Sequence, residues 1–375
     1  MKKVLFVTGT RADFGKLKPL ISVVSKDDGF ECKIFCTGMH LMEKYGNTIV
    51  EIHRAGFTEN IYPFLNQIEG ESMELVLSNT IAGLSRYVHE NKVDLIVVHG
   101  DRIEALAGAT VGALKNILVA HVEGGEVSGT IDDLIRHACS KMSHIHFVAS
   151  KTAEKRLKQL GEDKKSIYRI GSPDIDIMLS DTLPSIDDAK KRYDIQFENF
   201  AIATLHPVTT EIENAKFHAE IFVNSILESN QNYILIYPNN DLGSNFIFDA
   251  LKILDNNPRV KIFPSIRFEY FLTLLKYSNF IIGNSSTGIH EAPVYGVPTI
   301  NIGTRQYKRF DYESINNVPF IQDNIQKAIL EALHTYRFTP TNHYGNGNSA
   351  EGFLNALKSD TLWGTSQQKI FSDLA

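Results

Sequence analysis

The sequence has few cysteines, no excess of positive charge and no long apolar run, and each absence excludes a class of protein. Its three cysteines, Cys32, Cys36 and Cys139, form no C-x-x-C pair, and their odd number excludes a disulfide framework that uses all of them. The formal net charge is −6, so the chain lacks the basic footprint of a nucleic-acid-binding protein. No apolar run approaches the roughly 20 residues of a membrane-spanning helix. We therefore expect a cytoplasmic protein that binds neither nucleic acid nor a membrane.

The beginning of the chain does not have the pattern of a secretory signal. The apolar run Val4–Val7 is short, and Gly9–Asp13 stands where a small-residue cleavage region would be expected. At 375 residues, with 43% apolar and 22% charged residues, the chain has an ordinary globular composition but is too long for one core. We expect two domains, and we interpret the first apolar run as the first strand.

Short β-branched runs alternate with longer amphipathic segments, which is the pattern of βα units on parallel sheets. The first half is expected to contain the strands Val4–Thr8, Lys33–Cys36, Leu95–Val98, Ile117–Ala120, His146–Val148 and Ser166–Ile170, with helical segments such as Glu71–Glu90 and Arg102–Lys115. The second half is expected to contain Phe200–Thr204, Tyr233–Tyr237, Val260–Phe263, Phe280–Ile282 and Thr299–Ile302. The predicted fold class is α/β, with two Rossmann-like, doubly wound domains.

A polar, turn-rich passage separates the two halves of this pattern. It starts at Ser172-Pro173-Asp174 and runs to about Phe197, and we place the domain junction there. The expected boundaries are residues 1–172 for the first domain, 173–197 for the linker and 198–349 for the second domain. Two such domains in tandem place two sets of loops across a cleft, and ligands favour such domain interfaces.

Acidic residues stand in glycine-rich loops directly after two expected strands. Asp101 follows the strand Leu95–Val98, and Glu123 follows the strand Ile117–Ala120. In an open parallel sheet the loops at the carboxyl ends of the strands form the ligand crevice. Acids from two such loops can therefore meet around one small substrate.

The loop that begins at Glu123 continues through further acids to a predicted helix that starts near Ile131. One interpretation is that Glu126, Asp132 and Asp133 cap this helix, because acidic residues stabilise the first turn. We assign that role to Asp133. We keep Asp132 as a candidate for catalysis.

Six motifs in the same order resemble those of the UDP-N-acetylglucosamine 2-epimerases, and within that family the hydrolysing branch. The resemblance runs from residue 4 to about residue 357. The motifs are Gly9-Thr10-Arg11-Ala12-Asp13-Phe14-Gly15-Lys16-Leu17, His99-Gly100-Asp101-Arg102, the loop Glu123–Asp133, His206-Pro207-Val208-Thr209-Thr210, Gly283-Asn284-Ser285-Ser286-Thr287-Gly288 and Gly303-Thr304-Arg305-Gln306. The hydrolysing branch is favoured by Arg11-Ala12-Asp13 in place of Arg-Pro-Glu, and by Glu123-Gly124-Gly125-Glu126 in place of Glu-Ala-Gly-Leu-Arg.

The resemblance implies a GT-B arrangement of the two domains, with a UDP-sugar in the cleft between them. It implies no cofactor, neither metal nor nicotinamide, and the release of UDP with a free N-acetylmannosamine-type sugar. It also implies a homodimer or a dimer-based oligomer, and a bacterial route to sialic-acid-type surface sugars. By analogy, a last helix near Ala350–Lys358, within residues 350–375, is expected to pack back on the first domain.

The expected chemistry needs more than one proton-transfer group. Anti elimination removes the C2 proton and expels UDP to leave a glycal, and inversion at C2 then needs a proton on the opposite face. By resemblance, Asp101, Glu123 and Asp132 match the catalytic acids, without an order among them. His206 titrates near neutral pH and is predicted to donate a proton.

The remaining predicted site residues bind the UDP moiety. Ser285 and Ser286 precede a predicted helix that begins near Ile289, and a helix start is an anion site. By resemblance both serines bind the diphosphate and Glu291 accepts from the ribose hydroxyls. The planar guanidinium group of arginine can donate two hydrogen bonds to phosphate oxygens. The full set of predicted binding residues is Arg11, Arg102, Ile266, Phe271, Ser285, Ser286, Glu291 and Arg305, of which Ile266 and Phe271 hold the uracil.

Several alternatives remain open at this point. The substrate is either UDP-N-acetylglucosamine or UDP-2,4-diacetamido-2,4,6-trideoxyglucose, and a non-hydrolysing 2-epimerase is a neighbouring possibility. A GT-B glycosyltransferase would share the UDP site but has no use for several acids near C2. A UDP-sugar sensor without turnover would gain nothing from them either. The pair His144 and His146 lacks further ligands and is interpreted as structural rather than metal-binding.

Overall fold

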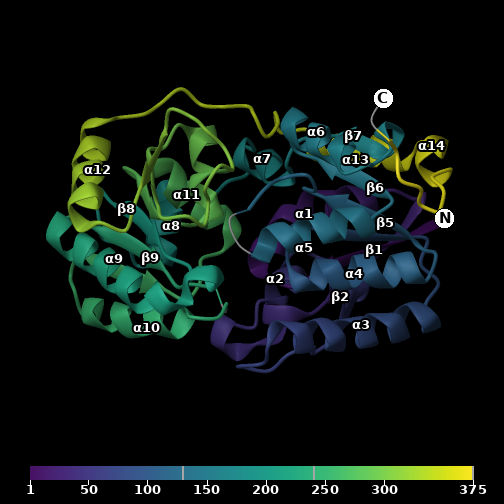
Figure 1. Cartoon of the computed structure of the whole chain (residues 1–375), viewed down its shortest axis with the longest axis horizontal. Coiled ribbons are helices and arrows are strands. Elements are labelled where there is room, and N and C mark those ends of the chain that lie inside the picture. Colours follow the sequence, from purple (N-terminus) through teal and green to yellow (C-terminus); the bar gives the residue numbers. More distant parts are fainter. Residues whose placement is uncertain (129–130, 240, 374–375) are drawn as a thin grey trace. The chain divides into compact units, whose positions relative to one another are not determined.

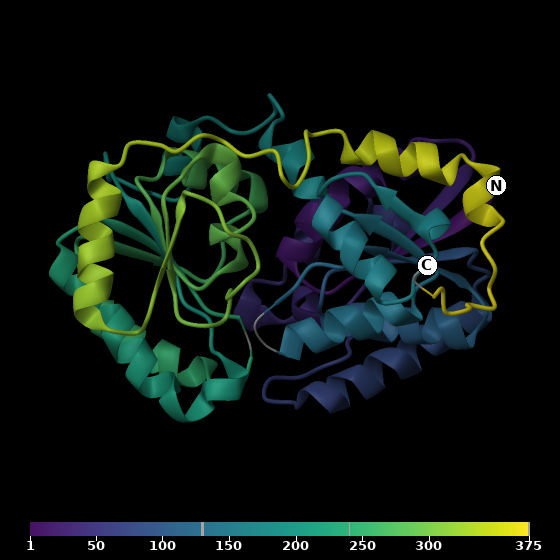
Figure 2. The ribbon, with the colours of Figure 1, turned by 45° about the horizontal axis from the view of Figure 1, so that its top comes forward.

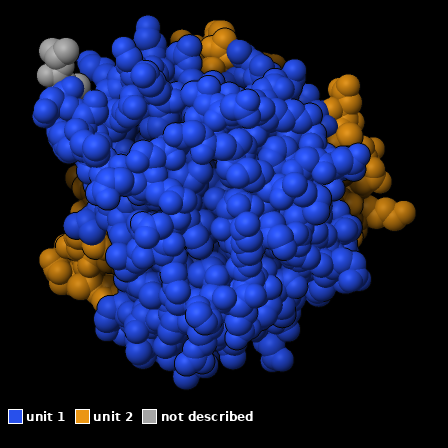
Figure 3. Space-filling view, turned by 90° about the vertical axis from the view of Figure 1, so that its right-hand side faces the viewer, with its two compact units in different colours: residues 1–126, 132–180, 343–375 blue, residues 127–131, 181–342 orange. Residues whose placement is uncertain are grey.

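The computed structural model describes residues 1–128, 131–239 and 241–373 (Figure 1). The chain forms two compact units, coloured separately in Figure 3. Unit 1 comprises residues 1–126, 132–180 and 343–375, and unit 2 comprises residues 127–131 and 181–342. Gly129 and Thr130, in the middle of the predicted acidic loop, lie outside the described residues.

Unit 1 is built on a seven-stranded sheet in the order β3-β2-β1-β4-β5-β6-β7, and every pair in it is parallel. Its strands are β1 (Lys2–Thr8), β2 (Phe30–Cys36), β3 (Ile61–Pro63), β4 (Leu95–His99), β5 (Leu118–Val122), β6 (Ile145–Val148) and β7 (Ile167–Arg169). The strand order reverses between β1 and β4. Ligands of doubly wound sheets bind at this switch point, outside the carboxyl ends of the strands.

Helices cover both faces of this sheet, as the pattern of alternation on β1 requires. Val4 and Phe6 point into one apolar cluster, and Leu5 and Val7 point into another. The helices of unit 1 are α1 (Arg11–Ser25), α2 (Ile49–Arg54), α3 (Met73–Glu90), α4 (Ile103–Leu114), α5 (Ile131–Met142), α6 (Lys151–Gln159), α7 (Pro173–Met178), α13 (Ser349–Leu357) and α14 (Asp360–Trp363). Both faces of the sheet are therefore buried, which explains why its strands are almost purely apolar.

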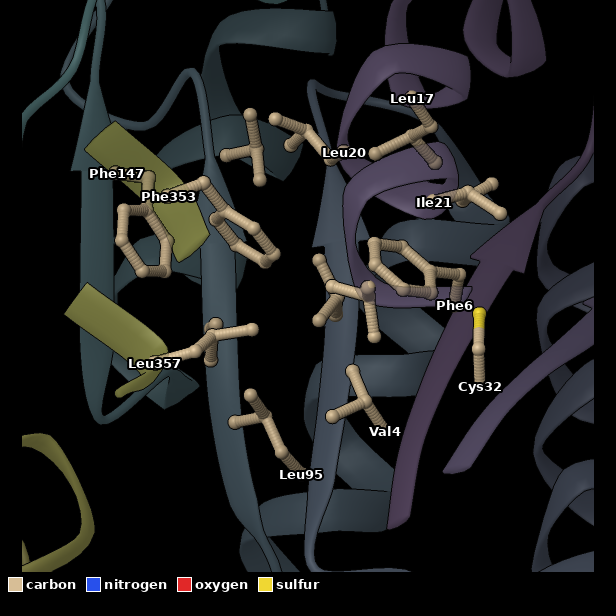
Figure 4. Close-up of a cluster of buried hydrophobic side chains, with 14 of the residues drawn as sticks. Val4, Phe6, Leu17, Leu20, Ile21, Cys32, Leu95, Phe147, Phe353 and Leu357 are labelled. Atoms are coloured by element: carbon tan, nitrogen blue, oxygen red, sulfur yellow. The ribbon is translucent and has the colours of Figure 1, made fainter. Parts of the chain in front are cut away.

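Helix α13 completes the first of these clusters although it lies near the end of the sequence. Its Phe353 is fully buried, with its ring centroid 4.6 Å from that of Phe147 on β6 and 6.1 Å from that of Phe6 on β1 (Figure 4). Leu357 of the same helix is 1% exposed. Helix α13 thus belongs to the core of unit 1.

Unit 2 repeats the architecture with six parallel strands in the order β10-β9-β8-β11-β12-β13. They are β8 (Ala201–Thr204), β9 (Tyr233–Ile236), β10 (Val260–Phe263), β11 (Ile281–Gly283), β12 (Thr299–Ile302) and β13 (Ile315–Val318). The helices are α8 (Ile186–Arg192), α9 (Ala215–Ser229), α10 (Ser244–Leu251), α11 (Phe268–Tyr277) and α12 (Gln322–His334). Its switch point lies between β8 and β11.

One local expectation was wrong. The helix predicted near Ile289 does not form, and the chain makes two short 3-10 turns instead, Ser286–Gly288 and Ala292–Tyr295. Pro293 stands in the second turn, and Gly296 ends it with a left-handed φ of +64°. The serine loop therefore does not open a regular helix, and the anion site argued from a helix terminus is not present there.

Within the described part of the chain, no helix combines the length and the apolar character needed to cross a membrane.

Candidate functional site

The loop after β1 presents Asp13 at the switch point of unit 1. Thr10 caps α1 by accepting a hydrogen bond of 3.1 Å from the backbone N–H of Asp13, and Asp13 Oδ2 accepts one of 3.1 Å from the N–H of Gly9. This reciprocal cap holds the Asp13 side chain in place. Its other oxygen, Oδ1, lies 2.8 Å from Nδ1 of His99, the last residue of β4. The loops after the two central strands are thus linked side chain to side chain.

His99 is buried between two carboxylates. Its Nε2 lies 3.1 Å from Glu123 Oε2, on the side opposite Asp13. Burial alone would lower the pKa of the imidazole, but the charges and hydrogen bonds of Glu123 and Asp13 outweigh it and raise the pKa to about 9. His99 is therefore an imidazolium at neutral pH, with both ring nitrogens donating.

Glu123 follows β5, and its side chain has several partners. Its backbone has a left-handed φ of +60°, and its side chain is 6% exposed. Besides His99, its carboxylate accepts from the Ser172 hydroxyl and lies 3.7 Å from Lys16 Nζ. Lys16 also pairs at 3.1 Å with Asp174, which is fully buried. Two cations thus stabilise the negative charge of Glu123.

Arg136 on α5 binds two of the predicted catalytic residues. Its guanidinium is 4% exposed, donates to the carboxylate of Asp101, and donates at 2.7 Å to the backbone carbonyl of Glu123. Burial would lower the pKa of Arg136, but Asp101, Glu123, Glu126 and Asp132 together raise it. Asp101 therefore contacts the buried arginine through its carboxylate and Glu123 through its backbone carbonyl, and the charge of Asp132 helps to raise the pKa of Arg136. Asp101 retains a side-chain exposure of 24%, so a ligand can reach it.

The other acids of this loop have separate partners. Glu126 is buried, accepts from the Ser150 hydroxyl at 3.1 Å and lies 3.9 Å from Arg156. Asp133 lies in the first turn of α5, where an acidic residue is favourable, and pairs with His137 at 3.5 Å. These contacts give both acids a structural explanation.

The two predicted arginines of unit 1 are half-buried and paired with carboxylates. Arg11 Nη2 lies 3.6 Å from Glu51, and Arg102 Nε lies 3.4 Å from Glu104, which is 3% exposed. Glu104 sits against the backbone of the loop after β1, since a Cβ on Gly9 would lie 2.7 Å from its carboxyl carbon. The arginines are therefore oriented by acids and are not simply solvated.

In unit 2, His206 is fixed by the neighbouring loop at the switch point. Its backbone N–H donates at 2.7 Å to the side chain of Asn284, which donates back at 2.8 Å to the carbonyl of His206. The N–H of Asn239 donates at 3.0 Å to Nδ1 of His206. Because Nδ1 accepts, the neutral ring carries its hydrogen on Nε2, so Nε2 is the donor atom of the ring.

The two reciprocal hydrogen bonds between Asn284 and the backbone of His206 form a clip, and the predicted phosphate-binding residues lie next to it. Ser285 caps the first 3-10 turn by accepting from Thr287, and Arg305 Nη1 donates at 3.2 Å to the carbonyl of Asn284. Gln306 donates to the same carbonyl at 3.0 Å. Ser286 begins the turn and is half-buried, and Glu291 is 3% exposed. Arg305 and the two serines are therefore held at the same end of the sheet.

The predicted uracil pair lies in an apolar cluster. Ile266 is 6% exposed, and Phe271 on α11 packs at the edge of the same cluster. Both side chains contribute to the core of unit 2. Any contact with a base would use the backbone of Ile266 and the outer edge of Phe271.

Sequence reasoning missed the cations that organise the acids. Arg136, Lys16 and His99 were not among the predicted site residues, nor were Asp13 and Asp174. One signal was present for Arg136, since it stands four residues after Asp132 on one helix face. For Asp174 the signal was misleading, because Ser172-Pro173-Asp174 has the composition of a turn.

The fold and the site together define a class of protein. It has two parallel-sheet α/β units, with charged side chains gathered at the carboxyl ends of the strands, as in nucleotide-binding folds. The chain belongs to the UDP-N-acetylglucosamine 2-epimerase family, whose sequence model matches residues 22–358.

Individual relatives resemble the chain over nearly its full length. A Neisseria meningitidis serogroup B protein named UDP-N-acetylglucosamine 2-epimerase is 47% identical and aligns over 100% of both chains. A Legionella pneumophila protein named UDP-N,N'-diacetylbacillosamine 2-epimerase (hydrolyzing) is 32% identical, over 96% of this chain and 97% of its own length. The crystal structure of Methanocaldococcus jannaschii UDP-GlcNAc 2-epimerase superimposes with a TM-score of 0.82 at 22% identity, over 95% of this chain and 99% of that one. That structural likeness confirms the predicted two-unit α/β fold.

Proposed function

We propose that the protein is a hydrolysing UDP-N-acetylglucosamine 2-epimerase, which converts UDP-N-acetylglucosamine and water to N-acetylmannosamine and UDP. The observation that carries the proposal is that Asp101 and the carbonyl of Glu123 both contact the buried Arg136, whose pKa the charge of Asp132 also raises. The Neisseria relative, which is named a 2-epimerase, supports the epimerase activity. The Legionella relative, which is named a hydrolysing 2-epimerase, supports the hydrolysing mode.

The reaction proceeds in two balanced steps. A base takes the C2 proton, the C2–H electrons form the C1=C2 double bond, and the C1–O bond breaks to release UDP. Water then adds its oxygen to C1 of the glycal and gives one proton to a base, while an acid delivers a proton to the opposite face of C2. At least two proton-transfer groups are needed, and one must start ionised and the other protonated.

The environment of Glu123 suits the base. The imidazolium of His99 and the ammonium of Lys16 stabilise its charge before the reaction, and His99 remains hydrogen-bonded to it. Asp101 and Asp132 are the further acid candidates, and His206, with its hydrogen on Nε2, is a donor from unit 2.

The assignment gives each unit its own set of roles. Unit 1 supplies the groups that act on the sugar, with Arg11 and Arg102 as candidate diphosphate ligands. Unit 2 supplies Ser285, Ser286 and Arg305 for the diphosphate, Glu291 for the ribose, and Ile266 and Phe271 for the base. Because the expulsion of UDP builds charge on its β-phosphate, hydroxyl and guanidinium donors aimed at it lower the barrier.

A second substrate is favoured by the Legionella relative, whose name gives a diacetylated UDP-sugar. The chemistry at C1 and C2 is the same for UDP-2,4-diacetamido-2,4,6-trideoxyglucose. The two sugars differ at C4 and C6, away from the bonds that the acids act on. The same residues would therefore serve both.

The experiment is proton NMR of the purified protein with UDP-N-acetylglucosamine in D₂O. We expect UDP and free N-acetylmannosamine with deuterium at C2. The Glu123→Gln variant is the control, and its turnover should fall roughly 10²- to 10⁴-fold because its amide cannot take the proton. UDP-N-acetylmannosamine as the product would contradict the hydrolysing mode. If neither UDP-sugar reacts with the wild-type protein, the proposed function is wrong.

A further inference from the structure

The segment from Thr365 to Asp373 is attached to unit 1 at several points and ends next to α5. It turns back after α14 (Figure 2). Ser372 donates a backbone hydrogen bond of 2.9 Å to the carbonyl of Gly161, and the ring of Phe371 lies 4.6 Å from Lys141 Nζ. The carbonyl of Gln367 lies 3.2 Å from Nε2 of His144. This segment is therefore an integral part of unit 1.

Lys369, in the middle of that segment, caps the carboxyl end of α5. Its ammonium donates to the carbonyls of Ser140 at 3.1 Å, Lys141 at 2.7 Å and Ser143 at 2.5 Å. These carbonyls lie in and just after the last turn of the helix, where oxygens lack partners within the helix. A cation at this end also interacts favourably with the helix dipole. Lys369 thus holds the carbonyls of Ser140, Lys141 and Ser143, while the carbonyl of Cys139 accepts from the Ser143 hydroxyl at 2.8 Å.

A buried carboxylate keeps Lys369 in this position. Glu162, with a side chain 1% exposed, lies 2.5 Å from Lys369 Nζ. Burial would raise the pKa of Glu162, but His146 and Lys369 outweigh it and lower the pKa to about 2. Glu162 also contacts Lys141 at 3.0 Å and His146 at 2.9 Å. Removal of Lys369 would therefore leave Glu162 with two partners, so the fold should tolerate it.

The other half of α5 carries the groups that hold the candidate acids. Arg136 is one turn before Ser140, roughly 6 Å along the axis at 1.5 Å per residue. It donates to Asp101 and to the carbonyl of Glu123, and Asp132 lies one turn earlier still. A displacement of the last turn of α5 is therefore transmitted to Arg136 within the same short helix.

A second connection runs through Ser140 itself. Its hydroxyl lies 2.9 Å from Nδ1 of His121, whose Nε2 lies 2.7 Å from the carbonyl of Gly100. Burial lowers the pKa of His121 to about 3, so the ring is neutral and donates from Nε2 to Gly100 while Nδ1 accepts from Ser140. Gly100 precedes Asp101. The residue capped by Lys369 thus also supports the loop that presents Asp101.

We propose that Lys369 is a positioning residue for the reaction: by clamping the carboxyl end of α5, it fixes Arg136, and through Arg136 the relative placement of Asp101 and Glu123. The inference rests on the proposed function, because the acids act only if the protein turns over a UDP-sugar. Nothing in it requires Lys369 to touch the substrate.

The test compares Lys369→Met, which removes the ammonium, with Lys369→Arg, which keeps a donor cation. For Lys369→Met we expect kcat for UDP-N-acetylglucosamine to fall roughly ten- to hundredfold, as small misplacements of catalytic groups do, with KM unchanged. Lys369→Arg should restore most of kcat. The control is Lys358→Met, an exposed lysine of unit 1 that pairs with Asp27 at 2.6 Å. A wild-type kcat in Lys369→Met, a change in KM alone, or no rescue by arginine would overturn the proposal.

Hydrogen exchange separates this proposal from the proposed function. In Lys369→Met we expect faster exchange of the α5 amides from Arg136 to Met142, while β4 keeps its protection. If the wild-type protein turns over no UDP-sugar, the proposed function fails, yet unchanged exchange along α5 would still overturn the clamp. The measurement needs only the folded protein.

Discussion

At the scale of single residues, His99 makes the stability of unit 1 depend on pH over an unusual range. Its pKa is about 9 in the folded protein because Asp13 and Glu123 hold the imidazolium, against an ordinary value of 6.5. A group whose pKa is raised on folding contributes its full stabilisation below the unfolded value and loses it as the pH rises through the folded value. The contribution is on the order of 3 kcal/mol below pH 6.5 and is lost towards pH 9.

We therefore expect His99→Gln to lower the midpoint of thermal unfolding at pH 6 much more than at pH 9.5. Glutamine carries no positive charge and cannot donate to both carboxylates. The variant therefore lacks the stabilisation that the imidazolium gives at low pH and that the wild-type protein itself loses at high pH. Thermal unfolding followed by circular dichroism from pH 6 to pH 9.5 measures the difference. His89→Gln, at an exposed position on α3, should show no such trend. An equal effect of His99→Gln at every pH would contradict the assigned charge.

The acids and their cations differ in how visible they are in the sequence. Asp101 and Glu123 were predicted because each is a carboxylate in a glycine-rich loop directly after an apolar strand. Local structure does not require an acid at such a position, so a functional role is expected. Arg136 and Lys16 lie inside helices among other polar residues, where charged side chains are expected in any case. Their role follows from burial and from partners far along the chain, such as Asp174 for Lys16. Neither can be read from local composition.

At the scale of elements, Asn284 ties the ends of β8 and β11 together. It is fully buried, accepts from the N–H of His206 and donates to the carbonyl of the same residue. Because the amide supplies both N–H donors and an oxygen acceptor, it can satisfy both backbone groups, whereas a carboxylate only accepts. The placement of His206 beside Ser285 depends on this clip.

Asn284→Asp should therefore both destabilise the protein and reduce turnover. A buried carboxylate would face the carbonyl of His206 without its hydrogen bond, at a cost of about 1–3 kcal/mol or more. Denaturant unfolding and steady-state kinetics measure the two effects. Asn224→Asp, at an exposed position on α9, is the matched control and should leave both unchanged. Normal kinetics in Asn284→Asp would mean that the clip does not position His206.

The elements that were not predicted share a physical reason. The sequence pattern predicted eleven of the strands, but β3 and β13 were missed, and each is an edge strand. Ile61–Pro63 ends in a proline, and Ile315–Val318 has two asparagines at its centre. An edge strand has a partner on one side only and needs little apolar character. The helix predicted near Ile289 fails for a different reason. Pro293 and Gly296 lie close together in the segment, and they end a run that is otherwise typical of a helix.

At the scale of the whole molecule, the proposal separates binding of the nucleotide from chemistry on the sugar. Most of the groups assigned to the nucleotide, such as Arg305 with Ser285 and Ser286, belong to unit 2, and Arg11 and Arg102 are the candidate diphosphate ligands of unit 1. The acid cluster around Arg136 belongs to unit 1. The variants Arg305→Gln and Glu123→Gln, each titrated with UDP, test whether binding and chemistry are separate.

We expect Arg305→Gln to weaken the binding of UDP about tenfold or more, since a hydrogen bond to a charged group contributes roughly 1.5–3 kcal/mol. Glu123→Gln should leave the Kd of UDP unchanged while it lowers turnover roughly 10²- to 10⁴-fold, the usual contribution of a general base. Titration calorimetry with UDP measures the affinities, and NMR measures turnover. The control for the first variant is Arg259→Gln, an exposed arginine of unit 2. If Glu123→Gln lost UDP binding as well, the acid cluster would be acting on the nucleotide, and the roles assigned to the two units would have to be redrawn.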